Sequence, residues 1–170
     1  MAQQLKQIDP RKLSGNVFRM MGDEWFLFTA GTLNDYNTMT AAWGGLGYLW
    51  EKPVAIGFVR PQRHTFGFAE RHGHFTFSFF GAKYRKALQF CGSHSGRDCD
   101  KAAQTGLTPR ATRLGNVYFG QARLVLECRK IYWQDIDPGH FLAKELHKIY
   151  PGHDYHRMYV GEIVGCLKAR

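Results

Sequence analysis

The feature that most constrains the fold is an apolar run of strand length with a sharply defined end. Residues 54–59 read VAIGFV, a mixture of β-branched and aromatic side chains typical of a buried strand. Arg60 then adds a charge, and Pro61 cannot donate a backbone hydrogen bond to a neighbouring strand. We therefore expect a buried strand that stops at Arg60, with irregular chain after it.

Comparable runs recur along the chain, and only short helical segments separate them. Residues 74–80 alternate and are strongly aromatic, whereas residues 82–90 repeat apolar side chains at helical spacing. Gly44, Gly45 and Gly47 are expected to interrupt the second strand. The pattern predicts a mostly β fold, an antiparallel barrel with a few short helices. The expected strands are 24–30, 38–43, 54–60, 74–80, 121–133 and 157–167, and the expected helices are 65–71, 82–90, 100–105 and 141–149.

Length and composition indicate one domain in a reducing compartment. The 170 residues suit a single domain, residues 1–170, whose polar first 15 residues are expected to form a surface arm. No signal peptide or membrane-length apolar run is apparent, and the four cysteines lack the spacing of a metal or redox motif. We expect free thiols and a cytoplasmic protein. The net charge of +9 favours anionic partners, although scattered basic residues also suit an ordinary solvated surface.

The segment from Asn37 to Gly47 combines small residues, hydroxyls and three glycines. Such residues allow a backbone to approach a flat ligand closely, and they can also simply form a glycine-rich turn between two strands. Met39, Thr40 and Ala41 directly precede Trp43, which is expected to be exposed. We interpret this segment as one wall of a site for a planar ring.

Cationic and hydroxyl side chains cluster where the third strand gives way to a helix. Arg60, Arg63 and Thr65 either decorate the surface around a helix start or form a cradle for a phosphate group. Together with the ring wall, they suggest a cofactor of the mononucleotide type. Ser93, Ser95 and Lys101 follow in a loop that resembles a phosphate loop in composition only, so a structural turn is an equal alternative.

Other chemistries find weaker support in the sequence. Histidines at 72, 74, 153 and 156 lack a carboxylate or cysteine at ligand spacing, so no metal is expected. Residues 65–69 match an RNA-binding strand pattern in three places only, which makes nucleic acid an unlikely partner. A hydrolase is not expected either, since neither a nucleophile motif nor a carboxylate pair is present.

Several segments, taken together, resemble one known family. They are residues 37–47 (NTMTAAWGGLG), 52–65 (KPVAIGFVRPQRHT), 79–80 (FF), 90–101 (FCGSHSGRDCDK) and 155–164 (YHRMYVGEIV). Over residues 20–168 the chain is similar to the flavin reductase-like, FMN-binding split-barrel family, most of all to its flavoredoxin-like branch. The resemblance implies a split β-barrel of antiparallel, Greek-key-like topology and a homodimer with FMN near the subunit interface. One departure is that Arg63-His-Thr65 replaces the Ser-x-Thr of many flavin reductases, which leaves the main phosphate ligand open.

The resemblance also implies a role for individual residues. Thr38, Met39, Thr40, Ala41, Ala42 and Trp43 would line the isoalloxazine and ribityl chain, with Phe79 and Phe80 beside the ring. Arg60, Arg63 and Thr65 would bind the phosphate, and Ser93, Ser95, Gly96, Arg97 and Lys101 would complete the anion site. His156 would face the nicotinamide side.

Two functions are compatible with this resemblance. The first is an oxidoreductase that passes electrons from NADH or NADPH to FMN and on to an acceptor, which can be a redox partner protein or an oxygenase. The second is an FMN-binding electron carrier that has no NAD(P)H site of its own and exchanges electrons with an iron–sulfur partner.

Overall fold

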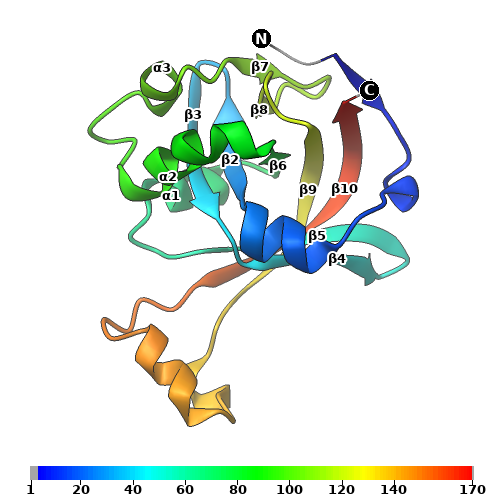
Figure 1. Ribbon diagram of the computed structural model, residues 1–170. Coiled ribbons are helices and arrows are strands. Elements are labelled where there is room, and N and C mark those ends of the chain that lie inside the picture. The colour runs from blue at the N-terminus through cyan, green and yellow to red at the C-terminus, as the bar shows by residue number, and fades with distance from the viewer. Residues whose placement is uncertain (1–3, 170) are drawn as a thin grey trace.

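A computed structural model describes residues 4–169. The main element is an eight-stranded antiparallel sheet in the order β3-β2-β6-β9-β10-β5-β4, with β1 added along β10 (Figure 1). Because the order ends at β3 on one side and β4 on the other, the sheet is open, as in a split barrel. The strands are β1 (Leu5–Gln7), β2 (Phe26–Thr32), β3 (Asp35–Ala41), β4 (Gly44–Leu49), β5 (Lys52–Val59), β6 (His74–Phe79), β9 (Leu124–Asp135) and β10 (Arg157–Ala169), while β7 (Pro109–Ala111) and β8 (Val117–Phe119) form a separate hairpin.

Short helices fill the connections. The α-helices are α1 (His64–Arg71), α2 (Arg85–Ser93) and α3 (Lys101–Thr105), and Arg19–Glu24 forms a single π-helical segment, η2. Asp100 caps α3 by accepting a hydrogen bond from the N–H of Ala103, and Gly106 ends it in the left-handed conformation that glycine tolerates best. The 3₁₀ segments are η1 (Pro10–Lys12), η3 (Ala82–Tyr84), η4 (Pro138–His140) and η5 (Lys144–Ile149). No helix among residues 4–169 is long and apolar enough to cross a membrane.

The sheet buries two apolar clusters, one on each of its faces. The barrel interior is rich in aromatic rings, including Phe26, Phe28 and Phe77, with 4.4 Å between the ring centroids of Phe26 and Phe77. The second cluster lies on the other face, where Leu27 and Val125 pack against Leu88 of α2. This alternation along β2 and β9 is the expected pattern for strands covered on both faces.

One expectation about the strands needs correction. Gly44, Gly45 and Gly47 do not interrupt a strand but form the edge strand β4, which among residues 4–169 pairs with β5 alone. Within residues 1–15, which were expected to form a surface arm, Leu5–Gln7 pair with β10; residues 1–3 lie outside the described part of the chain. The short strands β7 and β8 were not expected.

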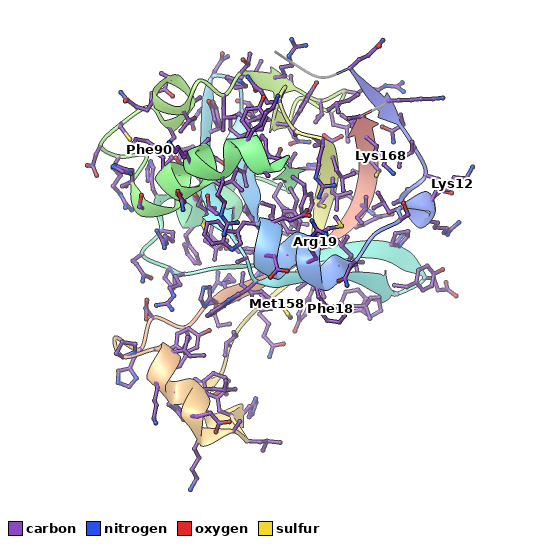
Figure 2. All side chains as sticks on the ribbon, viewed as in Figure 1. Lys12, Phe18, Arg19, Phe90, Met158 and Lys168 are labelled. Carbon is purple, nitrogen blue, oxygen red and sulfur yellow. The ribbon has the colours of Figure 1, made fainter. Side chains whose placement is uncertain are left out.

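The link between β9 and β10 projects away from the barrel (Figures 1 and 2). We call residues 136–155 the arm. It contains η4 and η5 in place of the α-helix expected over residues 141–149. Leu142 at its outer part is 99% exposed, so the arm has little apolar contact with the barrel there.

Candidate functional site

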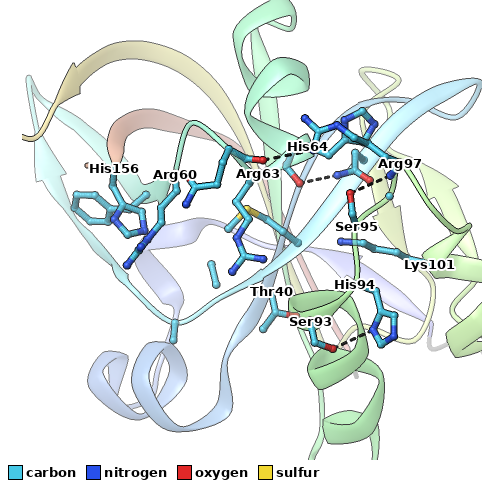
Figure 3. Close-up of a pocket in the computed structure, with 18 of the residues that line it drawn as sticks. Thr40, Arg60, Arg63, His64, Ser93, His94, Ser95, Arg97, Lys101 and His156 are labelled. Atoms are coloured by element: carbon cyan, nitrogen blue, oxygen red, sulfur yellow. Dashed lines mark hydrogen bonds between the residues drawn. The ribbon is translucent and has the colours of Figure 1, made fainter. Parts of the chain in front are cut away.

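The candidate site is an open cavity of about 500 Å³ between β3, the start of α1 and the loop from α2 to α3 (Figure 3). This volume lies within the range of about 300–1,000 Å³ that small-molecule sites usually have. Nineteen residues line it: Asn37, Met39, Thr40, Ala41, Ala42, Trp43, Phe58, Arg60, Gln62, Arg63, His64, Thr65, Ser93, His94, Ser95, Gly96, Arg97, Lys101 and His156.

The charge of the cavity wall is one-sided. Four of the lining residues are Arg or Lys, and none of the described residues that line the cavity is Asp or Glu. The wall also lowers the pKa of His64, through burial first and then through the nearby charges of Arg97 and Lys101. A wall of this kind favours an anionic ligand, since a cation would meet only like charges.

Strand β3 supplies the apolar wall of the cavity. It is the last strand on its side of the sheet, so its outer edge has no neighbouring strand among the described residues. Backbone groups on such an edge are free to bond a ligand or a side chain. One of them, the carbonyl of Thr38, accepts a hydrogen bond of 2.9 Å from Nζ of Lys101. Met39, Ala41 and Ala42 add small or flexible apolar side chains to the same wall.

Lys101 is the buried cation of the site, with 7% of its surface exposed. Besides the Thr38 carbonyl, its Nζ donates a hydrogen bond of 2.8 Å to the carbonyl of Cys91. Burial lowers the pKa of Lys101, while the neighbouring Cys91 opposes that shift. Lys101 therefore ties β3 to the end of α2 and places a positive charge behind the cavity wall.

The anion end of the cavity is formed by the turn into α1 and the loop after α2. Arg63 precedes α1 and donates through Nη1 to the carbonyl of Gly92 at 2.9 Å. Thr65 lies in the first turn of α1, where unpaired helix N–H groups favour an anion. In the loop, the N–H of Arg97 donates to Oγ of Ser95 at 3.1 Å. Figure 3 shows Arg63, Ser95, Arg97 and Lys101 gathered on this side of the cavity.

His156 lies at the opposite end, beside Arg60 (Figure 3). Its ring is 8% exposed, contacts Trp43 at a centroid distance of 4.9 Å, and shares a hydrogen bond of 2.9 Å between Nδ1 and the hydroxyl of Tyr150. Burial, followed by the charge of Arg60, lowers the pKa of His156 to about 4. The imidazole is therefore neutral at physiological pH, and this end of the cavity is aromatic.

Most residues predicted for the site do meet in this one cavity. Those that line it are Met39, Thr40, Ala41, Ala42, Trp43, Arg60, Arg63, Thr65, Ser93, Ser95, Gly96, Arg97, Lys101 and His156. Arg60, however, is engaged elsewhere: its Nη1 lies 2.7 Å from Oδ2 of Asp154, and its Nη2 donates to the carbonyl of Ile149. Arg60 lies beside His156 at the aromatic end of the cavity, whereas Arg63 lies at the anion end.

Three predicted site residues lie outside the cavity. Phe79 is fully buried in the barrel interior against Phe26, because it occupies an inward position of β6. Phe80 packs in the second cluster and lines a different hollow, next to Arg85. The hydroxyl of Thr38 lies 2.7 Å from the buried hydroxyl of Thr29, outside the cavity, so only its backbone carbonyl serves the site. Phe79 and Phe80, expected beside the ring, are therefore not part of this cavity.

The cavity also contains residues to which no individual role was assigned: Asn37, Phe58, Gln62, His64 and His94. Asn37, His64 and Gln62 adjoin predicted residues in the sequence, so the extent of the motif was underestimated. No pattern in the sequence indicated that Phe58 faces the cavity, because both faces of β5 are apolar. Among residues 4–169, no group of three or more His, Cys, Asp or Glu side chains is arranged to bind a metal.

Comparison with known proteins agrees with this architecture. A family model described as "Flavin reductase like domain" matches residues 21–169. No curated protein matches the chain. An FMN-binding domain of a flavin reductases-like enzyme from Shewanella baltica superposes with a TM-score of 0.70 at 16% identity, over 99% of this chain and 79% of that chain.

Two further structures with the same fold differ in their described activity. Flavoredoxin of Desulfovibrio vulgaris gives a TM-score of 0.67 at 23% identity, over 97% of this chain and 76% of that chain. An NADH:FAD oxidoreductase of Streptomyces globisporus, solved with NAD and FAD fragments, gives a TM-score of 0.63 at 17% identity, over 84% of this chain and 73% of that chain. At these identities the likeness concerns the fold.

Proposed function

Because the chain belongs to the flavin reductase-like domain family, we propose that its cavity binds FMN and that the protein transfers electrons from NADH or NADPH to an acceptor. The observation that carries this proposal is the division of the cavity into two ends. One end gathers cations and hydroxyls without a carboxylate, and the other is walled by β3 and aromatic rings. A phosphate joined by a flexible chain to a flat ring has the same two parts.

The chemistry of the donor groups fits FMN. For the phosphate we assign Arg63, Thr65, Ser95, Arg97 and Lys101, which combine charge-assisted donors with the start of a helix. For the ring we assign the β3 wall from Met39 to Trp43, where edge backbone groups and small side chains allow close approach. Arg60 is assigned to the ring end, since Asp154 already pairs with it.

Bound FMN would supply the redox chemistry, by accepting a hydride from the nicotinamide and passing electrons on. The chain would orient the ring, exclude water with Trp43 and Phe58, and favour negative charge with its cations. His156 is assigned to the nicotinamide side. As a neutral ring it adds no charge there, and Tyr150 holds its orientation.

We propose that the protein forms a homodimer, in which the binding partner is a second copy of this chain. Exposed aromatic side chains support this proposal. Trp50 is 55% exposed and Tyr132 is 40% exposed, and their ring centroids lie 5.7 Å apart on the side of the barrel that carries β4. Trp43 on the cavity rim is 46% exposed. Large exposed aromatic groups often mark interfaces. A dimer through this side would cover the open rim at Trp43.

An electron carrier without its own NAD(P)H site is the second candidate. It is supported by the fold that the chain shares with a flavoredoxin. The two candidates differ in whether nicotinamide reduces the bound flavin directly.

The deciding experiment has two stages. The purified protein is first titrated into FMN, and quenching of flavin fluorescence at micromolar protein is the expected result. The complex is then mixed anaerobically with NADH or NADPH in a stopped-flow instrument. Rapid bleaching of the flavin absorbance supports the reductase, whereas a yellow complex that neither nucleotide bleaches supports the carrier. If FMN is not bound at all, both candidates are wrong.

A further inference from the structure

A buried hydrogen bond links β3 to the first turn of α1 at the anion end of the cavity. Nδ2 of Asn37 donates to Oγ1 of Thr65 over 2.8 Å, and the two residues are 28 positions apart in the chain. Both line the cavity, yet Asn37 is only 6% and Thr65 only 1% exposed. The pair is therefore shielded from solvent while it borders the ligand space.

The direction of this hydrogen bond determines what the threonine can do. A hydroxyl has one proton to donate and two lone pairs that accept. The amide of Asn37 uses one lone pair of Thr65, which leaves the threonine proton uncommitted. Within residues 4–169 no acceptor takes that proton, whereas the buried hydroxyls of Thr38 and Thr76 donate to the carbonyls of Phe28 and Val117. Thr65 is thus left as a donor beside the cavity.

Asn37 is held from its other side as well. Its Oδ1 faces Gly96 so closely that a β-carbon built on Gly96 would overlap that oxygen. Gly96 belongs to the loop that contributes Ser95 and Arg97 to the same end of the cavity. The amide of Asn37 therefore lies between Thr65 and this loop, and so borders both halves of the anion end.

We propose that Asn37 is a positioning residue for phosphate recognition: by donating to Oγ1, it makes Thr65 present its own proton to the phosphate of a flavin mononucleotide. This inference rests on the proposed function and extends it to a residue that need not touch the ligand itself. It also explains why an uncharged amide stands among cations. An amide can only donate through Nδ2, whereas a carboxylate at this position would accept the threonine proton and add a negative charge.

The test compares a ligand that carries the phosphate with one that lacks it. The dissociation constants of FMN and riboflavin are measured by fluorescence quenching for the wild type, Asn37→Ala, Asn37→Asp, Thr65→Val and the double variant N37A/T65V. Loss of one hydrogen bond to a charged group is expected to raise the dissociation constant of FMN about tenfold in N37A and in T65V. N37D is expected to raise it further, and riboflavin binding should change less than twofold in every variant.

The double variant separates positioning from direct contact. If Asn37 acts through Thr65, adding N37A to T65V should raise the FMN constant by less than about twofold, because no hydroxyl remains to be oriented. Asn116→Ala is the matched control, since it removes another partly buried amide hydrogen bond, to Glu127, away from the cavity. It should leave both flavins unaffected.

Four outcomes would overturn the inference. Equal weakening of FMN and riboflavin in N37A would show that Asn37 only shapes the cavity. Full additivity in the double variant would show that Asn37 binds the phosphate directly. Unchanged FMN binding in N37D would show that Thr65 already donates to residue 37. Failure of the wild type to bind either flavin would instead refute the proposed function, and FMN binding that is retained in all variants would refute the inference alone.

Discussion

Arg60 and Asp154 form an ion pair in which Nη1 and Oδ2 are 2.7 Å apart, and it joins the end of β5 to the base of the arm. Gln62 donates to the same carboxylate, and the Arg60 guanidinium lies 5.1 Å from the ring centroid of Tyr150. The hydrogen bonds from Arg60 and Gln62 lower the pKa of Asp154. The rim of the cavity and the arm are therefore connected through one carboxylate.

Replacing Asp154 by Asn should loosen the arm (residues 136–155) without weakening FMN binding in the cavity. The variant keeps the shape of the side chain but removes the charge that holds Arg60, so the arm is expected to open more often. Limited trypsin digestion should then cleave faster at Lys144 and Lys148, while FMN affinity changes less than twofold. Asp23→Asn, at an exposed carboxylate that the cavity does not include, is the control. Unchanged cleavage would show that the ion pair does not restrain the arm.

Arg63 should matter more than Arg60 for the phosphate. Arg63→Ala removes a cation from the anion end, and the loss of a hydrogen bond to a charged group is worth about 1.5–3 kcal/mol of FMN binding free energy. Arg60→Ala removes a guanidinium that Asp154 already neutralises, so a smaller loss is expected. Titration of both variants with FMN and riboflavin checks the order. If R60A loses more FMN affinity than R63A, with riboflavin unaffected, then Arg60 is a phosphate ligand.

His156 should make the folded protein sensitive to acid. Its pKa in the fold is about 4, below the ordinary value of 6.5, so the unfolded chain takes up the proton first as the pH falls. The stability present above pH 6.5 is therefore lost between about pH 6.5 and 4, by up to about 3 kcal/mol. Chemical denaturation at several pH values should show a shallower decline for His156→Gln than for the wild type. Parallel declines would contradict the assignment.

Gly96→Ala should imitate the loss of Asn37. The added β-carbon would overlap Oδ1 of Asn37, so the amide must shift and its hydrogen bond to Thr65 must lengthen or break. We expect weaker FMN binding with little change for riboflavin. Combining G96A with N37A should restore part of the space and give less than the sum of the two effects. Strict additivity of the two changes, measured by the same titration, would show that they act independently.

Lys101→Met should destabilise the fold as well as weaken FMN binding. The substitution keeps the apolar stem but removes a buried ammonium that donates to the carbonyls of Thr38 and Cys91. Leaving two buried carbonyls unpaired should lower the free energy of unfolding by about 2–3 kcal/mol. Urea denaturation measures this, with the exposed Lys86→Met as control. Equal stability of K101M and K86M would mean that water replaces the ammonium.

Regular elements with a clear period could be predicted from the sequence. The strand expected over residues 74–80 and the helix expected over residues 100–105 each match an observed element within a residue or two. The resemblance to the flavin reductase-like family is confirmed by the family match over residues 21–169. These features are local, or are carried by motifs that remain continuous in the chain.

Features that depend on long-range contacts could not be predicted. Phe79 and Phe80 are adjacent and similar, and only the pairing of β6 with β2 and β9 decides that one enters the barrel and the other the second cluster. The ion pair of Arg60 could not be predicted, because its partner Asp154 lies 94 positions away in the chain. Edge strand β4 was missed because glycines weaken a strand signal, while its pairing with β5 is what holds it.

The central place of β10 has a consequence for how the chain folds during synthesis. Among the residues that the structure describes, strands β4 and β5 join the rest of the sheet only through β10, which pairs with β5 on one side and β9 on the other. On a ribosome, the hairpin of residues 44–59 must therefore wait, unattached to the sheet, until about 100 further residues have been translated, a delay of roughly 5–20 s at usual elongation rates. During that interval the outer edge of β5 exposes the backbone groups that β10 pairs with in the finished sheet.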